Sequence, residues 1–254
     1  MCIFHIHFSP TGGTKKVGEY LLQPWEQEIE EINLLEVGRD FSAVEFREED
    51  ICYVSVPSFG GRVPSAATER LHQMKGYGAR AVAVCVYGNR AYEDTLLELK
   101  DILEQQGFSC MAGVAAVAEH SIMHQFAAGR PDAEDRSELT EFGTKIRNKI
   151  EESREYEVLH IPGNYPYKKL GVASMIPQAD VTCVDCKICA RECPVGAIDR
   201  KAPEKTDAEK CIACMHCIAV CPEKARRLDP LAVEKLTERL KDACMGRKQN
   251  ELFL

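Results

Sequence analysis

Eight of the 13 cysteines fall within 39 residues, between Cys183 and Cys221, and their spacing limits what this part of the chain can fold into. The segment 183–194 reads C-x2-C-x2-C-x3-C-P, and the same pattern recurs 28 residues later over 211–222. Three thiolates two residues apart can hold one iron–sulfur cubane on a tight loop, whereas the fourth cysteine, followed by proline, reaches the other cluster. The spacing therefore predicts two crossed ligand sets. They are Cys183, Cys186, Cys189 and Cys221 for one 4Fe-4S cluster, and Cys193, Cys211, Cys214 and Cys217 for the other.

A pair of zinc sites is the alternative for these cysteines, because C-x2-C pairs also bind Zn²⁺. A zinc site needs only two C-x2-C pairs and does not require the x3-C-P element, which this chain repeats at a fixed offset. We therefore favour iron–sulfur clusters. The segment resembles two-cluster bacterial ferredoxins along its whole length. Those proteins often carry glycine after the second cysteine of each run, where this chain has Lys187 and Met215. Crossed ligands place two clusters close together, which favours electron transfer over a purely structural role.

The first 155 residues alternate short apolar runs with helical patterns, which predicts a parallel, doubly wound α/β sheet. The expected strands are 2–8, 29–35, 51–57, 79–87 and 110–118. The expected helices are 14–22, 65–74, 93–105 and 137–151, and the connection 36–50 is expected to be irregular. Five such strands fit the flavodoxin-like order 2-1-3-4-5. Ligands then bind at the carboxyl ends of the strands, beside the switch point between strands 1 and 3.

Three loops follow strands 1, 3 and 4, so they are expected to meet at that edge. The first runs from Ser9 to Lys16 and opens a helix, whose free N–H groups suit a phosphate. It is not a P-loop, and no G-x-G-x-x-G occurs anywhere in the chain. The pattern Ser9-x-Thr11-Gly12-x-Thr14 is similar to the flavodoxin loop that holds the phosphate of FMN.

The same resemblance implies that the loops 57–64 and 87–94 enclose the isoalloxazine ring of FMN. Phe59, Tyr87 and Tyr92 offer flat surfaces for stacking, and Asn89 and backbone groups are expected to hydrogen-bond the ring. The segment 119–132, after the fifth strand, should reach the same rim. The residues assigned to FMN are Ser9, Thr11, Gly12, Gly13, Thr14, Pro57, Ser58, Phe59, Gly60, Gly61, Tyr87, Gly88, Asn89, Arg90 and Tyr92.

The whole chain resembles a family of fused flavodoxin–ferredoxin proteins, mostly from anaerobic bacteria. The resemblance rests on the phosphate loop, on 60–64 and 87–90, on 119–121 with 129–132, and on the paired cysteine runs. We expect an FMN-binding domain over 1–155 and a Pro- and Gly-rich connector over 156–180. Residues 181–254 should form a small α+β ferredoxin-like domain with two 4Fe-4S clusters and a closing helix over 231–244.

Charge and hydropathy exclude several classes of function. The formal net charge of −8 disfavours a nucleic-acid or anionic-membrane binder. No apolar run is long enough to span a membrane, and the N-terminus lacks a signal-peptide pattern. Many cysteines without a disulfide framework favour the reducing cytoplasm. The expected localisation is therefore cytoplasmic.

These features predict an electron-transfer flavoprotein that couples one- and two-electron chemistry. It would pass electrons between FMN and two 4Fe-4S clusters and exchange them with redox partner proteins. The alternative is an FMN-dependent reductase of a small-molecule acceptor, such as a quinone, supplied with electrons through the clusters. The segment 119–132 motivates that alternative because its polar residues could contact a substrate over the flavin. Whether the chain is an enzyme, its catalytic residues and its oligomeric state stay open from the sequence.

Overall fold

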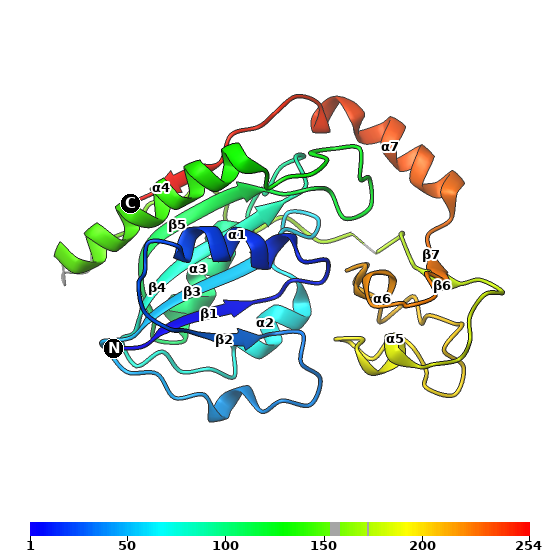
Figure 1. The fold of residues 1–254 in the computed structure, drawn as a ribbon, viewed down its shortest axis with the longest axis horizontal. Coiled ribbons are helices and arrows are strands. Elements are labelled where there is room, and N and C mark those ends of the chain that lie inside the picture. The colour runs from blue at the N-terminus through cyan, green and yellow to red at the C-terminus, as the bar shows by residue number, and fades with distance from the viewer. Residues whose placement is uncertain (153–157, 172) are drawn as a thin grey trace.

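The computed structural model describes residues 1–152, 158–171 and 173–254, and its centre is a six-stranded sheet (Figure 1). The strand order is β2-β1-β3-β4-β5-β8. The strands are β1 (Ile3–His7), β2 (Ile29–Asn33), β3 (Ile51–Pro57), β4 (Arg80–Tyr87), β5 (Ser109–Val117) and β8 (Glu251–Phe253). The first five are parallel, so the predicted flavodoxin-like order is confirmed.

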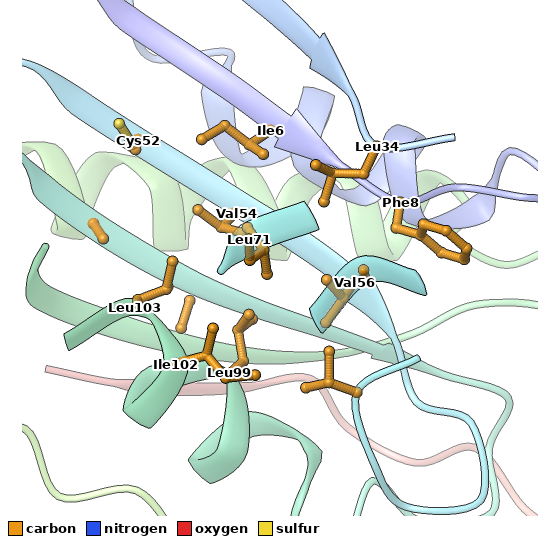
Figure 2. Packing of buried hydrophobic residues seen from close by; sticks show 14 of the residues in the cluster. Ile6, Phe8, Leu34, Cys52, Val54, Val56, Leu71, Leu99, Ile102 and Leu103 are labelled. Atoms are coloured by element: carbon orange, nitrogen blue, oxygen red, sulfur yellow. The ribbon is translucent and has the colours of Figure 1, made fainter. Parts of the chain in front are cut away.

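Helices cover both faces of this sheet because successive residues of each buried strand point to opposite faces. In β3, Cys52 and Val54 pack on one face and Tyr53 on the other. The first face carries α2 (Ser65–Leu71) and α3 (Thr95–Gln105), whose leucines meet the strands in Figure 2. The second face carries α1 (Gly13–Leu22) and α4 (Ala133–Glu152). The connection predicted to be irregular contains only the short 3-10 helix η1 (Phe41–Ala43).

The cysteine-rich region forms a separate small α+β unit beside the carboxyl ends of the strands (Figure 1). It contains α5 (Ile188–Arg191), α6 (His216–Ala219) and an antiparallel pair, β6 (Gln178–Ala179) with β7 (Arg226–Arg227). The sequence repeat is also a structural repeat. Lys187 and Met215, 28 residues apart, both have φ of +64° and both precede a one-turn helix.

Residues 158–171 of the connector run along the first domain. The Asp94 carboxylate, before α3, accepts hydrogen bonds from the backbone N–H groups of Asn164 at 2.9 Å and Lys168 at 2.6 Å. The Arg62 guanidinium donates to the Lys168 carbonyl at 2.7 Å. Residues 156, 157 and 172 of the predicted connector lie outside the described residues.

The C-terminal segment returns to the first domain, which the sequence did not predict. Helix α7 (Pro230–Cys244) leads from the cysteine-rich unit, and β8 then pairs antiparallel with β5. The Asn250 side-chain oxygen accepts a hydrogen bond from the Val117 backbone N–H at 2.9 Å. Its amide nitrogen donates to the buried Asp135 carboxylate at 3.0 Å. We call residues 245–254 the C-terminal strap. The predicted division at 155 and 180 stays a prediction, but the strap packs with the first domain.

Candidate functional site

The first loop leads from β1 into α1 at the edge where the parallel strands end. Gly12, with φ of +91°, turns the chain into the helix, a backbone conformation that favours glycine. The Ser9 hydroxyl accepts a hydrogen bond from the Lys15 backbone N–H at 2.9 Å, so it holds the loop together. Thr11, Gly13 and Thr14 line a small cavity in front of the helix N-terminus. Hydroxyl and N–H donors at the positive end of a helix suit a phosphate group.

The other two predicted loops meet the first at this edge. Phe59 and Tyr87 line both the small cavity beside the first loop and a larger one of about 580 Å³ next to it. Six of the residues assigned to FMN line the larger cavity: Ser58, Phe59, Gly60, Tyr87, Gly88 and Arg90. The loop 57–64 closes tightly, because Gly61 has φ of +89° and an added Cβ would lie 1.9 Å from the Glu93 carboxylate.

Three side chains assigned to the ring are engaged elsewhere. The Asn89 amide, 2% exposed, donates to the carbonyls of Cys244 at 2.6 Å and Gly246 at 2.7 Å. The Tyr92 hydroxyl donates to Glu251 at 3.2 Å, and Arg90 pairs with Glu93 at 3.0 Å. Asn89 and Tyr92 therefore hold the strap, and neither residue lines the two cavities.

His120, from the segment 119–132, lines both cavities. The backbone N–H groups of Ile122 and Met123 donate to its Nδ1 at 3.1 and 3.2 Å. An Nδ1 that accepts leaves the proton on Nε2. Burial, helped by the charges of His124 and Arg90, lowers the pKa of His120 to about 4. A neutral imidazole therefore stands at the rim at physiological pH, and the segment reaches the site as expected.

The eight motif cysteines gather around two separate cavities, and each cavity has the composition that the spacing predicts. Cys183, Cys186, Cys189 and Cys221 line one, and we call them the outer group. Cys193, Cys211, Cys214 and Cys217 line the other, and we call them the inner group. Burial raises the pKa of Cys214 to about 12, so binding as a thiolate displaces a proton.

The loops around these cysteines supply backbone hydrogen bonds to sulfur. The N–H groups of Ala197, Ala213 and Ala225 donate to Cys193 at 3.3 Å, Cys211 at 3.4 Å and Cys221 at 3.3 Å. Ala213 and Met215 have positive φ, which explains why glycine would also be suitable in such a loop. Alternating backbone conformations of this kind gather N–H groups toward an anion, and a thiolate-bound cluster is one.

Each of the two cavities offers four thiol groups as donors, the ligand set of a 4Fe-4S cluster. Among the residues that the structure describes, no three or more His, Cys, Asp or Glu side chains are arranged to hold one metal ion. Zinc would draw four ligands to about 2.3 Å from one point. In a cubane each thiolate binds a different iron, so the sulfurs stay farther apart. The four cysteines that line each cavity therefore fit a 4Fe-4S cubane.

The inner group lies against the predicted FMN site. Cys214 lines the small cavity together with Thr11 and Thr14, and Cys211 lines the large one. His216 Nδ1 lies 2.9 Å from the Pro10 carbonyl of the first loop. Because a carbonyl only accepts, the proton of this imidazole is on Nδ1.

A second contact joins the two units. The buried Arg70 guanidinium of α2 donates to the Pro194 carbonyl at 2.9 Å, and Val195 and Ile212 pack against the core of the first domain. Sequence reasoning did not find Arg70, because nothing in its local pattern marks a partner 124 residues away. The outer group has no such contact with the large cavity, and its Cys186 is exposed.

The cysteine-rich unit matches a known domain family. The family described as "4Fe-4S dicluster domain" matches residues 182–225. A curated relative, one of the subunits of the ion-translocating oxidoreductase complex of Methanosarcina acetivorans, is 48% identical over 50 residues. The match covers 19% of this chain and 19% of that protein, so the chain spans about a fifth of that relative's length. The first domain lies outside the residues that the family model matches.

Solved structures similar to the first domain include two flavodoxins. A flavodoxin of Streptococcus pneumoniae is 16% identical, with a TM-score of 0.42, and the match covers 59% of this chain and 99% of that one. Flavodoxin 2 of Bacillus cereus is 15% identical, with a TM-score of 0.44 and the same coverage. Within the described ranges, no helix has the length and apolar composition needed to cross a membrane.

Proposed function

We propose that this chain, a flavodoxin–ferredoxin fusion by its strand order and its paired cysteine motifs, carries electrons between a protein partner and FMN through two 4Fe-4S clusters. Bound clusters exchange single electrons and bound FMN exchanges one or two, so the pair couples the two kinds of chemistry. The chain's own residues hold and order these groups. Thr11, Thr14 and the N-terminus of α1 would bind the phosphate, and Phe59 and Tyr87 would flank the ring.

One observation supports an ordered path: the two cysteine groups differ in what they adjoin. The inner group lines both cavities assigned to FMN through Cys211 and Cys214. The outer group lines neither of these cavities and has Cys186 at the surface. Electrons would therefore be exchanged with a partner protein at the outer group, and the inner group would connect it to the flavin.

Flavin reduction in single cysteine variants tests this order. A reduced small ferredoxin, mixed anaerobically with the protein, should bleach the flavin absorbance. Cys186→Ala, at the exposed site, and Cys214→Ala, beside the first loop, should both slow the bleaching at least tenfold. Cys52→Ala, in the core of the sheet, is the matched control and should leave the rate unchanged. Wild-type rates in both motif variants would refute the path.

A reductase of a small flat acceptor is the second candidate, and the larger cavity favours it. Its volume of about 580 Å³ is lined on the cysteine-rich side by apolar residues that include Met175, Leu236 and Leu240. Steady-state turnover with a reduced low-potential donor and a panel of quinones distinguishes the two functions. Turnover of a quinone would support the enzyme, whereas exchange with proteins alone would support the carrier.

A further inference from the structure

Among the described residues Arg226 is the largest fully buried side chain, and it lines the cavity of the outer group. Its guanidinium Nη1 is 3.8 Å from Cys189 Sγ of the outer group. It also hydrogen-bonds Pro177 and Thr206, two residues that line the cavity of the inner group. One cation therefore contacts both predicted cluster sites.

This buried cation has no carboxylate partner among the residues that the structure describes. Its guanidinium donates to the Pro203 carbonyl at 2.5 Å, to the Pro177 carbonyl at 3.3 Å and to the Thr206 hydroxyl. Its Nε is buried without a hydrogen-bond partner. Burying a charge without a counter-ion is strongly unfavourable, so the arrangement calls for an anion at this place.

The internal repeat shows that the fold does not require a cation here. The 28-residue offset pairs Arg226 with Ile198, which is buried in the small core of the same unit. An apolar side chain in a corresponding position usually serves stability as well as or better than a buried charge. The arginine therefore has a role beyond packing.

We propose that Arg226 is a counter-ion shared by the two 4Fe-4S clusters, and that it raises the reduction potential of both. This inference rests on the proposed cofactors. Each reduction adds one electron to one cluster, with no bond made or broken, so the reduced state carries one more negative charge. A fixed cation beside both clusters stabilises that state. Charge and hydrogen bonds near the sulfurs are known determinants of cluster potential.

The test is an anaerobic redox titration with dithionite, followed by electron paramagnetic resonance, on Arg226→Ile. The reduction equilibrium of both clusters should shift at least tenfold toward the oxidised state, which is about 59 mV for a one-electron couple. Arg227→Ile is the matched control, since Arg227 is the exposed neighbour paired with Asp180 at 3.0 Å. Its loss of charge is screened by solvent and should shift either equilibrium less than twofold.

Iron content separates the failure of this proposal from that of the proposed function. Full iron with both equilibria within twofold of wild type, or a shift in only one cluster, would overturn the shared counter-ion. If Arg226→Ile fails to assemble clusters, the potentials of Arg226→Lys and Arg226→Gln test the proposal instead. The lysine variant should keep both potentials and the glutamine variant should lower both, and equal potentials in the two would overturn the proposal. Wild-type protein without iron would refute the cofactors themselves.

Discussion

Replacing Asn89 should release the C-terminal strap, and the size of the effect follows from its contacts. In Asn89→Ala the carbonyls of Cys244 and Gly246 lose their donor. The Lys248 backbone N–H also loses its bond, 3.4 Å long, to the Asn89 side-chain oxygen Oδ1. At about 1 kcal/mol for each hydrogen bond, the loss is about 3 kcal/mol. A φ of +64° adds strain for alanine, which tolerates this region less well than asparagine.

Hydrogen exchange measured by mass spectrometry reads this effect locally, because a loosened segment opens without global unfolding. A loss of about 3 kcal/mol should speed exchange of the β8 amides by about 100-fold. Asn89→Gly removes the amide and relieves the strain, so it isolates the hydrogen bonds. Tyr92→Phe is the matched control, since it removes only the exposed contact with Glu251 and should change exchange less than threefold. Exchange of β8 at the wild-type rate in Asn89→Ala would refute the assignment of Asn89 to the strap.

Three further predictions concern the cofactor sites and the core. Cys214→Ala should lower iron by about half, from roughly eight per chain, and leave FMN bound, whereas unchanged iron would contradict the ligand set. Replacing Thr11 and Thr14 with valine should weaken FMN binding at least tenfold, measured by flavin fluorescence on dilution. Wild-type flavin occupancy would show that these hydroxyls do not bind the phosphate. Burial, with the charges of His7 and Lys15, lowers the pKa of His5 to about 3. The unfolded chain binds the proton below pH 6.5, so stability falls as pH decreases, by about 1.4 kcal/mol between pH 7.5 and 5.5. In His5→Gln the free energy of unfolding should lack that part of the decrease. Urea unfolding, followed by fluorescence of the single tryptophan, measures it at both pH values. An equal decrease in both proteins would contradict the prediction.

The sequence predicts the features whose signal is local. Strands β1, β3, β4 and β5 read as apolar runs, and a helical pattern follows each of these four. The predicted order of the five parallel strands is confirmed. The cysteine groups follow from spacing alone, and the structure gathers the same residues.

The features that the sequence did not predict depend on contacts between distant residues. Strand β8 has three residues, too few for a periodic pattern, and it pairs with a strand more than a hundred residues earlier. Asn89 looks like a ring contact in its loop, but its partner Cys244 lies 155 residues away. Arg226 had a signal in the repeat, because an arginine stands where the first copy has Ile198. Only the structure shows that it is buried.

Counting iron, sulfide and flavin in protein purified without oxygen tests the central claim most directly. Two cubanes and one FMN predict roughly eight iron, eight acid-labile sulfides and one flavin per chain, with the visible absorbance of both chromophores. Zinc in place of iron, or a colourless protein with neither group, would contradict it.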